Sequence, residues 1–215
     1  MRSISASVRD ASGDLEDRET LRFFVESLLA EYRAVESKIA RAYLLLLSIG
    51  AVYVFLRIGV VGELSMGPVK ISKLEPIRLG IPPVLAYLAY SVSALIGRSV
   101  MIDAICDEVF RKFLPGVYRQ QLHTSLTPSS TIVSSDVEMV DFIGGPTLLA
   151  WGVALKNTVV VCIPYVIAIA AVVYLFLDPG APGPAVWIGA AVSALFVVFG
   201  AVHLVVAFVV ELNKG

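Results

Sequence analysis

Charged residues are scarce in this chain. Only 16% of its 215 residues are Asp, Glu, Lys or Arg, whereas 57% are hydrophobic. A soluble globular domain carries about 25% charged and about 45–50% apolar residues. The net charge of −1 also lacks the basic excess of a nucleic-acid-binding protein, so we expect no nucleic-acid partner. The composition predicts a membrane protein.

The residues that most often carry chemistry are also few. The chain has two cysteines and two histidines, and it shows no histidine–carboxylate cluster, no glycine-rich phosphate loop and no GxSxG motif. Cys106 and Cys162 lie far apart, and we interpret both as small buried hydrophobes. These absences predict a protein without a metal or a cofactor that is not an enzyme.

Four stretches are apolar for roughly 20 residues, the length that a helix needs to cross a bilayer core. They predict an all-α polytopic integral membrane protein whose four transmembrane helices span about 42–61, 81–97, 158–177 and 185–210. Pro82 and Pro83 are expected in the first turn of the second span, where proline is tolerated. The Pro/Gly-rich run from Asp178 to Pro184 predicts a tight loop between the last two spans.

The distribution of lysine and arginine predicts the orientation. The segment before the first span holds seven such residues and the middle loop holds five. The loop between the last two spans holds none, and the loop between the first two holds three, namely Lys70, Lys73 and Arg78. Positive residues collect in cytoplasmic segments, so both termini are placed in the cytoplasm and the protein in a plasma membrane, the inner membrane if the source is bacterial. The first forty residues contain charges throughout and no apolar core of a cleavable signal peptide.

The cytoplasmic part is expected to be built from helices. After a disordered tail at 1–15, residues 16–215 form one domain with cytoplasmic helices at about 17–41, 98–114 and 137–143. The first of these helices should continue into the first span, and it carries an apolar heptad seam made of Leu21, Val25, Leu28, Tyr32, Val35 and Ile39. This seam packs either inside the chain or against another subunit or partner. Periodicity leaves both alternatives open.

Polar residues within apolar spans are the first candidates for function. The candidates for a pore or ion path are Arg57, Ser91, Ser93 and His203. Each has a structural alternative: Arg57 can reach the outer interface or pair with Glu63 or Asp178, and His203 can hydrogen-bond within the bundle.

Small residues at intervals of four let helices approach closely. The second span has Ala89, Ser93 and Gly97 at this spacing, and the fourth contains Gly189 and Gly200. Pro164 is expected to loosen or kink the third span. Outside the spans, the alternation from Val69 to Leu74 is typical of a short strand or an interfacial segment.

Two functions fit this layout. The first is a homo-oligomeric channel or pore gated through its cytoplasmic helices, since four helices are too few to enclose a wide path in one subunit. The second is a membrane-anchored adaptor or sensor that binds a soluble cytoplasmic protein. The layout of a cytoplasmic amphipathic helix leading into small transmembrane hairpins resembles that of membrane effectors in bacterial defence systems. That resemblance rests on the arrangement alone. The cytoplasmic part is large for a plain channel, which favours the second function.

Overall fold

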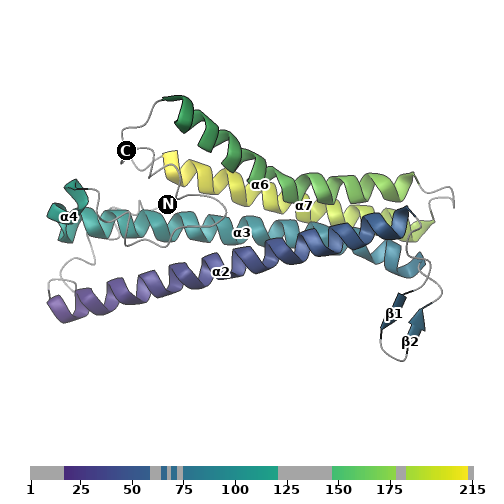
Figure 1. The fold of residues 1–215 in the computed structure, drawn as a ribbon, viewed down its shortest axis with the longest axis horizontal. Helices are drawn as coiled ribbons and strands as arrows, with labels where there is room; N and C mark the ends of the chain where they lie inside the picture. Colours follow the sequence, from purple (N-terminus) through teal and green to yellow (C-terminus); the bar gives the residue numbers. More distant parts are fainter. Residues whose placement is uncertain are drawn as a thin grey trace. The chain divides into compact units, whose positions relative to one another are not determined.

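The described part of the chain consists of long helices and one small hairpin (Figure 1). The structure is a computed structural model that describes residues 17–58, 64–66, 69–71, 75–120, 147–177 and 183–212. Its elements are α2 (Arg18–Arg57), β1 (Leu64–Met66), β2 (Val69–Ile71), α3 (Glu75–Phe113), α4 (Pro115–Arg119), α6 (Thr147–Phe176) and α7 (Pro184–Leu212). Among the described residues, α2, α3, α6 and α7 are long and apolar enough to cross a membrane.

Helix α2 begins at a side-chain cap. Asp17 directly precedes the helix, and its carboxylate accepts hydrogen bonds from the backbone N–H of Thr20 at 3.1 Å and from the Thr20 hydroxyl at 2.9 Å. These bonds hold the pKa of the Asp17 carboxyl below its ordinary value. The helix then runs for 40 residues through the expected junction at 41–42 without interruption. The segment that carries the seam and the first apolar stretch are thus one helix.

The start of α3 differs from the prediction. The helix begins at Glu75, so Pro82 and Pro83 lie in its interior and not in its first turn. Each proline lacks the N–H that would bond the carbonyl four residues earlier, which leaves the carbonyls of Arg78 and Leu79 without that partner. The helix starts six residues before Ile81. Pro76, which lies among these residues, does not prevent this because proline is tolerated in the first turn of a helix.

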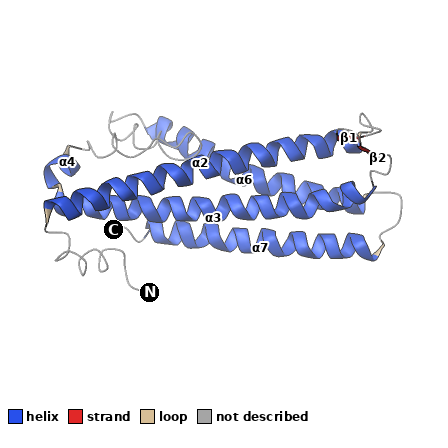
Figure 2. Ribbon diagram, turned by 90° about the horizontal axis from the view of Figure 1, so that it is seen from below, coloured by secondary structure: helices blue, strands red, loops and turns tan. Residues whose placement is uncertain are grey.

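Of the remaining predictions about local structure, some agree with the structure, one helix start differs, and two lie outside the described residues. The first three residues of the alternating segment, Val69–Ile71, form strand β2, which pairs antiparallel with β1 in the connection between α2 and α3 (Figure 2). Residues 72–74 lie outside the described residues. Helix α6 begins at Thr147, eleven residues before the predicted third span. The predicted helix at 137–143 and the predicted disordered tail at 1–15 lie outside the described residues.

The chain divides into two compact units, and helices α2, α3, α6 and α7 each contribute to both. The first unit contains Met1–Ala40, Leu95–Thr158 and Leu204–Gly215. In it, the stretches Arg18–Ala40 of α2 and Leu95–Phe113 of α3 are linked by polar contacts, and we call this pair of stretches the arm. Arg98 forms an ion pair with Glu31 at 2.7 Å, and the Ser99 hydroxyl donates to Glu36 at 2.7 Å.

Short helix α4 belongs to the first unit as well. It starts at Pro115, whose fixed φ suits a first helical position. Its Tyr118 hydroxyl donates to the Asp107 carboxylate on α3 at 3.5 Å. Burial, with Asp107 as the second cause, raises the pKa of Tyr118. This contact connects the end of the described α3–α4 segment to α3 itself.

The second unit contains Arg41–Ala94 and Val159–His203, and it is an apolar bundle of four helix segments. In both ribbon views these segments run alongside one another (Figures 1 and 2). Its core is made of small and large apolar residues, namely Leu46, Tyr53, Leu85, Ala86, Leu88, Ala89, Ala168 and Ala171. The alanines allow close approach of the helices, and the tyrosine brings a hydroxyl that needs a partner inside the bundle.

Candidate functional site

Side chains of α2 hold α6 by its backbone. The Tyr43 hydroxyl donates to the carbonyl of Val160, and the Tyr53 hydroxyl donates to the carbonyl of Ala171 at 3.2 Å. One turn after Tyr53, Arg57 Nη2 donates to the carbonyl of Tyr174 at 2.6 Å, and its guanidinium lies 5.8 Å from the centre of the Tyr174 ring. The donors and the acceptors advance in the same order, so α2 and α6 are parallel in the second unit.

The Val160 carbonyl is an acceptor because of a proline. Pro164 lies inside α6, four residues after Val160, and it has no N–H to offer to that carbonyl. In an apolar bundle an unpaired carbonyl is costly, and a neighbouring helix often satisfies it. Tyr43 does so here. Pro164 itself is buried, so the position where the helix loses its internal bond is packed against the bundle.

Two arginines meet the carboxyl-terminal ends of helices. Arg57 bonds the Tyr174 carbonyl in the last turn of α6, and Arg78 Nη2 donates to the Leu56 carbonyl in the last turn of α2 at 2.8 Å. The last four carbonyls of a helix have no partner within the helix, and the helix dipole places partial negative charge there. Both guanidinium groups therefore complete a helix end with a charged donor.

A pocket of about 400 Å³ lies beside these helix ends. Its two charged lining residues are the same arginines, and its other walls are aromatic or aliphatic. It is lined by Tyr53, Val54, Arg57, Ile58, Arg78, Tyr174 and Leu177. The Nε of Arg78 is buried and has no hydrogen-bond partner among the residues that the structure describes. Charged side chains and a cavity therefore coincide in this pocket.

Two of the predicted pore residues, Ser93 and His203, contact neighbouring helices. The Ser93 side chain is 1% exposed, donates to the Ala89 carbonyl at 3.0 Å and forms a hydrogen bond with the Tyr165 hydroxyl. The exposed His203 ring stands edge-on to Tyr90, with 5.6 Å between ring centres. Ser91 is half-buried on α3. Ser93 and His203 thus contact Tyr165 and Tyr90, whereas Arg57 contacts the Tyr174 carbonyl.

The predicted packing glycines differ in how much space surrounds them. A Cβ placed on Gly200 would lie 2.6 Å from the Tyr165 hydroxyl and 3.2 Å from the Tyr90 Cα. At Gly189 the nearest atoms would be 3.8 Å away, and one of them is the Leu79 carbonyl oxygen that the prolines of α3 leave without a partner in the helix. Ala89 is fully buried, and Gly97 is half-buried in the first unit.

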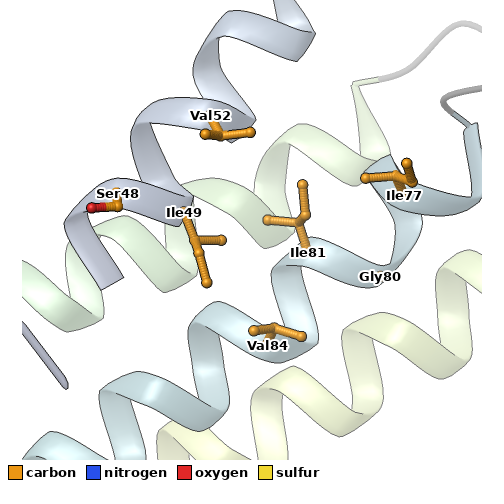
Figure 3. Close-up of a pocket in the computed structure, with 7 residues that line it drawn as sticks. All are labelled: Ser48, Ile49, Val52, Ile77, Gly80, Ile81 and Val84. Atoms are coloured by element: carbon orange, nitrogen blue, oxygen red, sulfur yellow. The ribbon is translucent and has the colours of Figure 1, made fainter. Parts of the chain in front are cut away.

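A second pocket, of about 470 Å³, separates α2 from α3 in the second unit (Figure 3). Side chains of the two helices face one another across it, and apart from Ser48 they are aliphatic. Its lining consists of Ser48, Ile49, Val52, Ile77, Gly80, Ile81 and Val84. The Ser48 hydroxyl donates back to the Leu44 carbonyl at 2.8 Å, so this pocket presents an apolar surface.

The heptad seam lies on the arm, and burial increases along it. Tyr32, Val35 and Ile39 are at most 3% exposed. Leu21, Val25 and Leu28, nearer the helix start, are half-buried. The contacts from Glu31 and Glu36 to α3 flank the buried half. The buried half of the seam is therefore covered by the chain itself, which favours the intramolecular alternative there.

The described residues contain no group of three or more His, Cys, Asp or Glu side chains that could hold a metal ion. Of the two cysteines, Cys106 is buried, but Cys162 is exposed on α6, contrary to the interpretation of both as buried residues. The exposed side of α6 is apolar, and a thiol fits such a surface as a small hydrophobe.

The geometry thus defines a four-helix apolar bundle with a polar two-helix arm. No protein-family model matches this chain, and neither a curated protein nor a solved structure is similar to it.

Sequence reasoning missed the tyrosines and Arg78. Tyr43, Tyr53 and Tyr165 read as apolar residues of the spans, whereas their hydroxyls connect helices. One signal was present in the sequence: an interior proline at 164 implies an unpaired carbonyl at 160, and a tyrosine in another span is a suitable donor. Arg78 was counted only as a loop charge because α3 was expected to start after it.

Proposed function

We propose that this protein crosses a membrane four times, with both termini in the cytoplasm, and acts as a membrane-anchored adaptor or sensor. The length of α2 and α3 carries this proposal. At about 1.5 Å per residue, helices of 40 and 39 residues are each about 60 Å long, twice the thickness of a bilayer core of about 30 Å. About half of each helix therefore belongs outside the hydrocarbon.

The polar half of these helices is the arm. Its ion pairs and its carboxylates require water or polar headgroups, whereas the bundle presents apolar side chains on its outside. The arm nevertheless exposes two large apolar side chains, Phe23 at 75% and Met101 at 53%. Aromatic and methionine side chains are enriched in protein–protein interfaces. They support a soluble protein partner for the arm.

The parallel order of the contacts between α2 and α6 supports the topology. If α2 enters the membrane from the cytoplasm, α6 must enter from the same side, and α3 and α7 return. Both termini then share one side of the membrane, and the lysine and arginine distribution assigns that side to the cytoplasm.

Helix continuity supports a sensing role. Because α2 and α3 each run without a break from the arm into the bundle, a partner that moves the arm also acts on the bundle helices. The same observation supports the homo-oligomeric channel as a second proposal, in which the arm gates a pore between subunits. The adaptor is favoured because the side chains of Ser93 and Arg57 are engaged within the bundle.

The test of the adaptor is site-specific crosslinking in native membranes. A photoreactive amino acid replaces Phe23 on the arm in one variant and Phe55, which is 49% exposed on the bundle, in a matched control. We expect the Phe23 variant to form an adduct with a different protein that the Phe55 variant does not form. Adducts containing only this chain from both positions would refute the adaptor.

The test of the channel is oligomeric state followed by conduction. Light scattering in mild detergent, with the detergent mass subtracted, gives the number of 23.1 kDa chains in a particle. A particle of four or more chains that passes ions in liposomes would favour the channel over the adaptor. A monomer without conductance would contradict the channel.

A further inference from the structure

The pocket at the end of α2 and α6 combines two cations with apolar walls. Arg57 and Arg78 are its charged lining residues, and Tyr53, Tyr174 and aliphatic side chains complete it. A cavity of about 400 Å³ is large enough for a small polar group. The pocket lies at the end of the bundle where α2 ends and α3 begins, which is the outer membrane surface in the proposed topology.

Each guanidinium has five N–H donors. Arg78 uses Nη2 for the Leu56 carbonyl, while its Nε is buried without a hydrogen-bond partner among the described residues. A buried N–H that lacks an acceptor is disfavoured, and a ligand that supplies an acceptor removes this cost. Among acceptors, phosphate matches the forked arrangement of guanidinium donors best.

The local charge also favours an anion. Arg57 and Arg78 bring two guanidinium groups to this pocket, each next to a helix end that carries only a partial negative charge. The Arg57 guanidinium is fixed by the Tyr174 carbonyl at 2.6 Å and lies over the Tyr174 ring. Both cations are therefore held in place before any ligand arrives, which lowers the entropic cost of binding.

We propose that this pocket binds the phosphate of an anionic phospholipid headgroup, with Arg78 as the principal ligand and Arg57 beside it. The phosphate oxygens accept hydrogen bonds from the N–H groups of Arg78, including Nε–H. The apolar and tyrosine walls contact the glycerol and the first methylenes of the lipid. The assignment of the phosphate to a lipid rests on the proposed membrane insertion. Recognition of the phosphate itself does not depend on it.

The experiment measures lipid binding to the purified full-length protein by native mass spectrometry in mild detergent. Phosphatidylglycerol, phosphatidylcholine and inorganic phosphate are the three probes. We expect phosphatidylglycerol to bind at least ten-fold more tightly than phosphatidylcholine, and Arg78→Gln to lower its affinity at least ten-fold. Arg78→Lys keeps the charge and a donor for Leu56 but lacks Nε–H, so it should show an intermediate loss if it folds like the native chain.

Arg22→Gln is the matched control because it removes one arginine charge from an exposed pair on the arm, and it should leave lipid affinity unchanged. Equal affinities for the two lipids, or an Arg78→Gln variant that binds as the native chain does, would overturn the proposal. Binding of inorganic phosphate without a preference between the lipids would overturn the lipid assignment. Alkaline carbonate extraction tests membrane insertion separately, so the two proposals fail distinguishably.

Discussion

At the scale of single residues, two glycines of the same helix, α7, differ in the space around them. Gly200 lies against the Tyr165 hydroxyl and the Tyr90 backbone, whereas the space around Gly189 admits a methyl group. A side chain can move away from an added methyl group, but the Tyr90 backbone belongs to a packed helix. Close approach of α7 to α3 therefore depends on Gly200.

We predict that Gly200→Ala lowers the free energy of unfolding by about 1–3 kcal/mol, the usual cost of overpacking a well-packed interior. Gly189→Ala should change it by less than about 0.5 kcal/mol, because the added Cβ meets only ordinary contacts. Reversible unfolding in mixed detergent measures both. Equal losses in the two variants would show that α7 does not approach α3 closely at Gly200.

A second prediction at this scale concerns the hydrogen bond from the Tyr43 hydroxyl to the Val160 carbonyl. Tyr43→Phe should destabilise the native protein by about 1 kcal/mol, because it leaves a carbonyl unpaired in an apolar surrounding. In a Pro164→Ala background residue 164 regains its N–H and can bond Val160, so the same substitution should cost much less. A double-mutant cycle of unfolding free energies measures this coupling. Additive effects would contradict the assignment of Tyr43 as the partner of a proline-released carbonyl.

At the scale of elements, the arm is held by one apolar seam whose halves differ in burial. Val35 is fully buried and Val25 is half-buried on the same helix. Flanking polar contacts add little, because ion pairs as exposed as that between Arg98 and Glu31 contribute at most about 1 kcal/mol. Most of the arm's stability comes from the buried half of the seam.

We predict that Val35→Ala destabilises the arm by about 2 kcal/mol through lost burial and a small cavity, and that Val25→Ala costs less than half as much. Thermal unfolding followed at several protein concentrations measures both effects. The Val35→Ala loss should not depend on concentration, since the seam is covered within the chain. A loss that grows on dilution would place the seam between subunits.

The elements also show what a sequence can and cannot predict. Length and apolar composition are local properties, so the four apolar stretches were recognisable. The start of α3 was misplaced because the Pro82–Pro83 pair suggests a helix beginning, whereas the preceding residues already form helix. The partner of an unpaired carbonyl was not recognisable, because Tyr43 and Val160 are 117 residues apart and only packing brings them together.

The candidate site shows the same limit. Arg57 was identified as an exceptional charge in an apolar segment, and it lines the pocket. Its expected carboxylate partners, Glu63 and Asp178, lie outside the described residues. Arg78 was passed over because loop arginines are common, and only its position next to the end of α2 makes it a helix-capping residue.

At the scale of the whole molecule, the proposed topology makes a prediction that needs no knowledge of function. In a background without the native cysteines, single cysteines replace Glu19 near the start of α2 and Gly183 just before α7. A membrane-impermeant maleimide should label position 183 in intact cells and position 19 only after permeabilisation. Labelling of position 183 only after permeabilisation and of position 19 in intact cells would reverse the orientation. Labelling of both in intact cells would contradict an odd number of crossings between the two positions.

The contacts between α2 and α6 have a consequence for how this bundle can change over generations. All three acceptors on α6 are main-chain oxygens, which every residue type possesses. Substitutions along its exposed side that keep α6 apolar therefore leave these bonds intact. The side chains that donate them belong to α2, whereas α6 contributes its proline and the small core residues Ala168 and Ala171. Another apolar helix that keeps these three residues at the same depths could therefore replace α6 and pair with α2 in the same register.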